Sequence, residues 1–104
     1  MLTANLHASR TSTIIATMSS ADADLLIKYF RRMAAANPTV EHWTRGIAMC
    51  ERWLEMIRGA PTQGDVDEFL QRLLAEQDAG SGWHDLNLRF SAWAASSGFA
   101  RTEQ

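Results

Sequence analysis

The chain has 104 residues, of which 46% are hydrophobic and 21% charged, and its formal net charge is −2. This length suits one domain with a modest core, and the charge gives no bulk electrostatic reason to expect nucleic acid or an anionic membrane as a partner. No run approaches the roughly 18 apolar residues of a membrane-spanning helix, so we expect no membrane association. The single cysteine, Cys50, excludes an internal disulfide, and we expect a cytoplasmic protein.

Residues 1–20 are predicted to form a flexible N-terminal segment outside the folded domain. They hold one arginine, one histidine and only a short apolar patch, which is too weakly basic and too interrupted for a signal peptide. The natural start could be Met1 or Met18, and the sequence leaves both open.

A first helix is predicted to begin at Ser20 or Asp22, either of which can cap it, and to continue through Ala34–Ala36. Its apolar stripe is expected to comprise Leu25, Leu26, Tyr29, Phe30 and Met33.

A long second helix is predicted from Asn37-Pro38-Thr39, where Thr39 can cap the first turn, to Gly59, which can adopt a left-handed conformation. Apolar residues recur along it at spacings of three and four: Val40, Trp43, Ile47, Cys50, Leu54 and Ile57. Cys50 lies on this stripe, so we interpret it as a core residue rather than a nucleophile. Glu41, Arg45, Ala48 and Arg52 fall on the opposite face.

Two shorter helices complete the domain. The turn Thr62–Asp65 leads into the third, whose apolar set is Val66, Phe69, Leu70, Leu73 and Leu74. Ser81 can cap the fourth, whose stripe is Trp83, Leu86, Phe90 and Trp93.

Gly98 is predicted to end the fourth helix, with Phe99 folding back on its last turn and residues 100–104 forming a polar tail. No segment alternates with the period of a strand. The sequence therefore predicts an all-α domain of four helices over residues 21–99.

Little in the sequence points to catalysis. His7, His42 and His84 lack neighbours at metal-ligand spacing, apart from the adjacent Asp85, so neither a metal nor another cofactor is expected. Glu51 and Glu55 form an i,i+4 pair of the kind usual on solvated helix surfaces. A catalytic carboxylate pair needs a pocket, for which four short helices offer little room. We expect no enzymatic activity from this chain alone and no small-molecule substrate.

Three motifs in order do resemble one family. They are Thr39-Val40-x-x-Trp43-x-x-x-Ile47-x-x-Cys50-x-x-Trp53-Leu54, Thr62-x-x-Asp65-Val66-x-x-Phe69-Leu70-x-x-Leu73, and Phe90-x-x-Trp93-x-x-x-x-Gly98-Phe99. This arrangement is similar to the core-binding domain of tyrosine recombinases of the phage-integrase type. The resemblance covers residues 23–99 and implies a SAM-like orthogonal four-helix bundle that forms half of a clamp around duplex DNA.

The resemblance implies DNA contacts along the second helix and around the fourth. In recombinases a separate domain carries the catalytic residues and the tyrosine nucleophile; Tyr29 belongs to the first-helix stripe, so no nucleophile is carried over. Whether a catalytic domain follows in a longer parent protein is open. The residues carried over as DNA-binding are Thr39, His42, Arg45, Arg52, Ser81, His84 and Arg89.

The chain departs from that family in charge. Residues 24–99 hold eight Lys and Arg against ten Asp and Glu, so we expect binding to double-stranded DNA to be weak in isolation. Arg45 and Arg52 can equally be ordinary surface residues paired with Glu41 or Glu55. The alternative is a small acidic helical protein that binds a protein partner, such as a mobile-element regulator or inhibitor, through an outward face containing Leu88, Ala92 and Ala95. The sequence gives neither a DNA target nor an oligomeric state.

Overall fold

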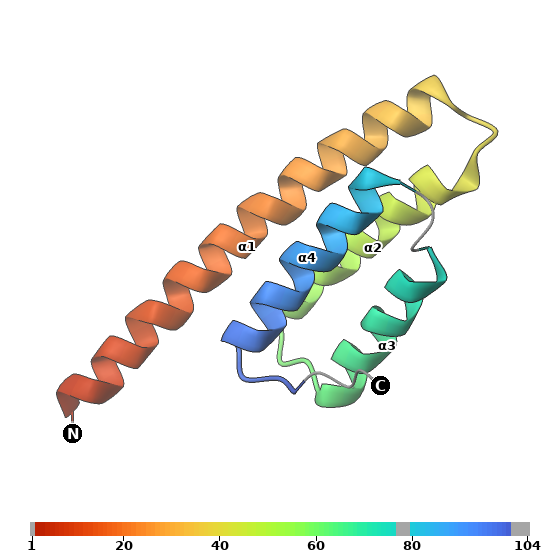
Figure 1. The fold of residues 1–104 in the computed structure, drawn as a ribbon. Coiled ribbons are helices and arrows are strands. Elements are labelled where there is room, and N and C mark those ends of the chain that lie inside the picture. The colour runs from red at the N-terminus through yellow and green to blue at the C-terminus, as the bar shows by residue number, and fades with distance from the viewer. Residues whose placement is uncertain (1, 77–79, 101–104) are drawn as a thin grey trace.

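A computed structural model describes residues 2–76 and 80–100, with side chains for residues 18–76 and 82–100. Four helices make up these ranges, without a strand: α1 (Leu2–Ala36), α2 (Glu41–Arg58), α3 (Gln63–Ala75) and α4 (Ser81–Ser96). Figure 1 shows α1, α2 and α4 lying along one another, with α3 on the side of α4 away from α1. The prediction of an all-α bundle of four helices is confirmed, whereas its SAM-like orthogonal arrangement stays a prediction.

Helix α1 is much longer than predicted. It is continuous from Leu2, so the predicted start at Ser20 or Asp22 is wrong, and its N-terminal part projects past the end of α4 (Figure 1). The sequence before Asn37 contains neither glycine nor proline, so nothing in the backbone forces a break. Ser19 is buried, which places the start of the packed part before residue 21. The flexibility of residues 1–20 stays a prediction, and residues 101–104 of the tail lie outside the described ranges.

Aromatic side chains from all four helices form the core. Phe69 of α3 stacks on Phe90 of α4 with ring centroids 3.9 Å apart, and Trp53 of α2 meets the same Phe90 edge-on at 5.8 Å. Two turns earlier on α4, Trp83 lies 5.5 Å from Phe30 of α1. Each such pair contributes on the order of 1 kcal/mol beyond the area it buries. Helix α4 is therefore the central element, in contact with each of the other three.

The buried face of α2 is wider than the predicted stripe. Trp43 and Cys50 are buried as expected, whereas Ile47 is only partly buried. The buried face extends further around the helix because α2 packs against both α1 and α4. Its full buried set is Trp43, Gly46, Met49, Cys50, Trp53 and Met56.

Two leucines assigned to the core are on the surface. Leu25 of α1 is 59% exposed and Leu74 of α3 is 58% exposed. Each lies at the edge of an apolar stripe whose centre faces the neighbouring helix, so both assignments are wrong.

The helix termini separate good local predictions from poor ones. Thr62 and Asp65 form a reciprocal capping box at the start of α3. Gly98 follows the end of α4, as predicted, and has φ of +91°. The amide of Phe99 donates to the carbonyl of Ala94 at 2.9 Å while its ring packs on Trp93.

Three other end assignments are wrong. Helix α2 is preceded by Val40, which makes no side-chain cap, rather than by Thr39. Gly59 ends α2 with φ of −100°, so it is not left-handed. Gly80, with φ of +116°, precedes α4, and Ser81 is its first helical residue.

Gly46 marks the closest approach of α1 and α2. A Cβ atom built there would lie 2.5 Å from the ring of Phe30, which is fully buried and cannot move aside. We predict that Gly46→Ala lowers the free energy of unfolding by about 1–3 kcal/mol despite the better helix propensity of alanine. Gly64→Ala is the matched control: its nearest atom would be 3.6 Å away, so it should be neutral or stabilising. Urea denaturation measures both, and equal effects would contradict the close contact.

Candidate functional site

The polar face of α2 is only partly exposed to solvent, because it also faces α3. A pocket of about 460 Å³ lies between the two helices, and Arg45, Ala48 and Arg52 of α2 line it. The expectation that four short helices leave little room for a pocket is therefore wrong. The sequence could not show this, because the space arises where α3 packs on α4 and stands away from α2.

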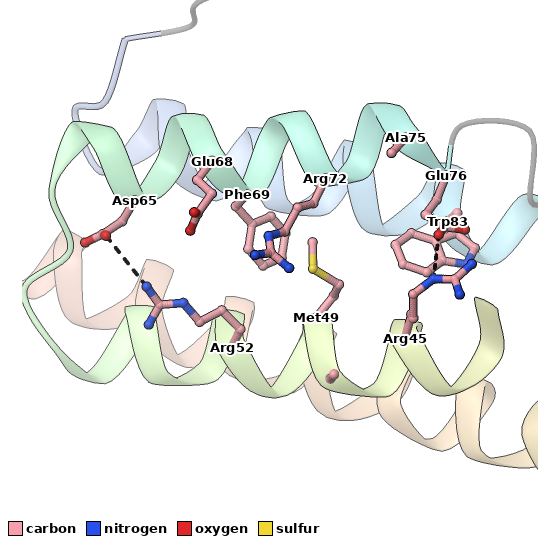
Figure 2. Close-up of a pocket in the computed structure, with 11 residues that line it drawn as sticks. Arg45, Met49, Arg52, Asp65, Glu68, Phe69, Arg72, Ala75, Glu76 and Trp83 are labelled. Atoms are coloured by element: carbon pink, nitrogen blue, oxygen red, sulfur yellow. Dashed lines mark hydrogen bonds and ion pairs between the residues drawn. The ribbon is translucent and has the colours of Figure 1, made fainter. Parts of the chain in front are cut away.

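One end of the pocket is closed by Arg45 and Glu76. The Nε atom of Arg45 donates to Oε1 of Glu76 at 2.6 Å, and its Nη1 atom lies 3.7 Å from a carboxylate oxygen of Glu41 (Figure 2 shows the first contact). The hydrogen bond to Glu76 raises the pKa of the Arg45 guanidinium above its ordinary value. Arg45 thus meets two carboxylates, one of them 31 residues away in the sequence.

The other end is closed by Arg52 and the start of α3. Nη2 of Arg52 lies 3.6 Å from Oδ1 of Asp65, and Nη1 lies 3.7 Å from Glu55 (Figure 2 shows the contact with Asp65). Asp65 also accepts the backbone N–H of Thr62, and this hydrogen bond lowers the pKa of its carboxyl group. Asp65 therefore both caps α3 and forms an ion pair with Arg52 of α2.

The middle of the pocket combines an apolar wall with two uncommitted charges. Met49, Phe69 and Trp83 supply apolar surface. Glu68 and Arg72 extend from successive turns of α3 towards α2 (Figure 2), and neither forms an ion pair or hydrogen bond with another described residue. The indole N–H of Trp83 is also buried without an acceptor.

Arg89 of α4 has a different setting from the two α2 arginines. Its Nε atom donates to Asp85 at 2.9 Å, one turn back, and its Nη1 atom donates to Asp22 of α1. The hydrogen bond to Asp85 raises the pKa of Arg89 above its ordinary value. This residue links α1 to α4.

The remaining predicted DNA-binding residues do not gather around the pocket. Thr39 and His84 are exposed, outside the residues that line it. His42 is partly buried against Trp43, with ring centroids 4.3 Å apart, and its Nε2 atom is buried without a partner. The side chain of Ser81 lies outside the described residues.

The interpretation of Arg45 and Arg52 as paired surface residues is confirmed for the pairs within α2. The pairs with Glu41 and Glu55 were visible in the sequence as i,i+4 and i,i+3 spacings. The pairs with Glu76 and Asp65 were not, because they depend on how α3 is placed.

The described part of the chain contains neither a cluster of metal-binding side chains nor an accessible thiol. No three His, Cys, Asp or Glu side chains gather there into a group that could hold a metal ion. Cys50 is fully buried in the core, and burial raises the pKa of its thiol to about 12. It is thus a neutral core residue, as predicted.

A second surface combines α1 and α4. We define the α1–α4 face as Met18 and Leu25 of α1 with Leu88 and Ala92 of α4. Met18 and Leu25 lie one turn on either side of Asp22, which Arg89 joins to α4. Leu88 and Ala92 are one turn apart on α4, and Ala92 is one turn beyond Arg89. All four side chains are exposed. Three of the four large exposed hydrophobic residues with described side chains lie here, and Leu74 is the fourth.

No family model, curated protein or solved structure matches this chain. Within the described residues, no helix is long and apolar enough to cross a membrane.

The capping role of Asp65 predicts a pH dependence of stability. Since its pKa is depressed in the folded state, its contribution is complete above the ordinary value of 3.8 and is lost as the pH falls through the lower folded value. Asp65→Asn should therefore lower the melting temperature at pH 7, and the difference from the parent should shrink as the pH falls below 3.8 and through the lower folded pKa. Thermal unfolding followed by circular dichroism tests this. A difference independent of pH would show that the charge of Asp65 does not contribute.

Proposed function

We propose that this chain is a non-catalytic interaction module that binds a helix of a protein partner on its α1–α4 face. The observation that carries the proposal is that Met18, Leu25 and Leu88, each more than half exposed, lie on two helices that pack against each other. Single exposed hydrophobic residues are ordinary, but several on one face are typical of an interaction surface.

The chemistry of the face defines the partner. The two aligned helices offer apolar side chains seven residues apart on α1 and four residues apart on α4, which suits the apolar stripe of an amphipathic helix. Between them, Asp22 and Asp85 share the single cation Arg89. The local excess of one negative charge around Arg89 favours a partner helix with a lysine or arginine placed to meet it beside the apolar stripe.

Leu74 provides a matched control for testing this proposal. It is the same residue type as Leu88 and equally exposed at 58%, but lies on α3. A photo-crosslinking amino acid placed at Leu88 or Leu25, in cells that express the chain naturally, should capture one and the same protein. The same group at Leu74 should not capture that protein.

Leu88→Glu should weaken binding of the captured protein by at least about 30-fold, as expected for a residue central to an interface. Leu74→Glu should leave the affinity unchanged, and calorimetry with purified proteins measures both. Equal capture from Leu74, or equal affinity of the two variants, would overturn the assignment of this face.

DNA binding in the manner of a recombinase core-binding domain is the second candidate. The half-exposed guanidinium groups of Arg45 and Arg52, two turns apart on α2 with Ala48 between them, support it. Their ion pairs are with exposed or partly exposed carboxylates, and such pairs are weak enough for a phosphate to compete. Against it stands the compensation of both arginines by acidic residues of α2 and α3.

Fluorescence anisotropy with labelled duplex DNA, between about 20 and 200 mM salt, tests this candidate. If α2 contacts DNA, Arg45→Glu/Arg52→Glu should abolish binding, and neutral Gln substitutions should reduce the salt slope by about two. Arg32→Glu/Arg58→Glu is the matched control, since it makes the same change of net charge outside the pocket. No binding at the lowest salt, or equal loss in both pairs, would exclude a DNA site on this face of α2.

A further inference from the structure

The pocket between α2 and α3 has the composition of a ligand site. Its volume of about 460 Å³ falls within the range of sites for small molecules, and its wall combines apolar side chains with a few charged groups. It is lined by three arginines and three carboxylates: Arg45, Arg52, Arg72, Asp65, Glu68 and Glu76. The lining is therefore formally neutral, which favours a ligand without net charge.

Four of these six charged groups are committed to each other. Arg45 is held by Glu76 at one end and Arg52 lies against Asp65 at the other, leaving Glu68 and Arg72 in the middle without partners among the described residues (Figure 2). Glu68 and Arg72 are one turn apart on α3, so their side chains reach the same part of the pocket. One carboxylate and one guanidinium thus face a single apolar space.

Trp83 adds to the apolar wall at the end of the pocket held by Arg45 and Glu76, and it is only 2% exposed (Figure 2). Its indole N–H is buried without an acceptor among the described residues, as is that of Trp53 in the core, so it is not counted among the groups that hold a ligand. Because the indole ring lines the pocket, the N–H signal of Trp83 reports on a ligand bound there.

We propose that this pocket binds a small apolar zwitterion, such as an amino acid with an aromatic or aliphatic side chain. The ligand carboxylate pairs with Arg72, its ammonium group pairs with Glu68, and its side chain lies against Met49 and Phe69. A purely anionic ligand would leave Glu68 opposed to it, and a purely cationic ligand would leave Arg72 opposed to it. The site is separate from the α1–α4 face, so the two proposals stand independently.

Three ligands with the same side chain and different charges test the proposal. L-phenylalanine carries both charges, N-acetyl-L-phenylalanine carries only the carboxylate, and L-phenylalaninamide carries only the ammonium group at pH 6. Each is titrated into the ¹⁵N-labelled full chain and followed by NMR. We expect phenylalanine, with millimolar affinity, to shift the indole N–H signal of Trp83 and amides of α2 and α3. The indole signals of Trp43, Trp53 and Trp93, which do not line the pocket, should stay in place.

The charge variants identify the partners of each ligand group. Arg72→Gln should weaken the binding of phenylalanine about tenfold, so that it binds no more tightly than phenylalaninamide. Glu68→Gln should weaken the binding of phenylalanine to a similar degree, so that it binds no more tightly than N-acetyl-L-phenylalanine. Arg32→Gln and Asp24→Asn, which change exposed charges outside the pocket, should leave the affinity unaltered.

Three results would overturn the proposal. They are the absence of shifts at about 20 mM phenylalanine, well above the expected dissociation constant, equal binding of all three ligands, and affinities unchanged by Arg72→Gln and Glu68→Gln. Because the substituted side chains lie on the surface of α3, the variants should keep the melting temperature of the parent, which circular dichroism verifies.

Discussion

The stacking of Phe69 on Phe90 is the contact on which the shape of the molecule depends. It fixes α3 to α4, while α3 meets α2 mainly through the charged side chains at the two ends of the pocket. Gln63 strengthens the same attachment, because its side chain donates to and accepts from the backbone of Ala100 just beyond α4. Helix α3 is therefore held from one side, and the space towards α2 is lined largely by charged side chains.

The sequence predicted those features that depend on residues close together in the chain. The turn at Thr62–Asp65, the helix stop at Gly98 and the return of Phe99 are all set by contacts within a few residues, and all are present. The long α1 was missed because Ser20 and Asp22 were taken as caps at a point where no residue actually breaks the helix. Leu25 and Leu74 were misplaced because periodicity identifies an apolar stripe but not which of its edges a neighbour covers.

The candidate site was harder to predict than the fold. The helical wheel correctly placed Arg45, Ala48 and Arg52 on one face of α2, but it treated that face as open. The carboxylates that pair with these arginines lie far away in the sequence: Glu76 is 31 positions from Arg45, and Asp65 is 13 positions from Arg52. Ion pairs over such separations follow from tertiary packing, and a single sequence does not contain that packing. The same neutralisation explains how a face with two arginines can belong to a chain of net charge −2.

The burial of Cys50 makes this chain well suited to site-specific labelling. Its only thiol lies in the core with a pKa near 12, so thiol reagents should pass over it while the fold is intact. A cysteine introduced on any exposed helix face then becomes the single reactive position, without prior removal of the native one. Conversely, the rate at which a thiol reagent slowly modifies Cys50 in the unaltered chain would report how often α1, α2 and α4 separate. It would thus measure the rate at which the core opens in molecules that are otherwise native.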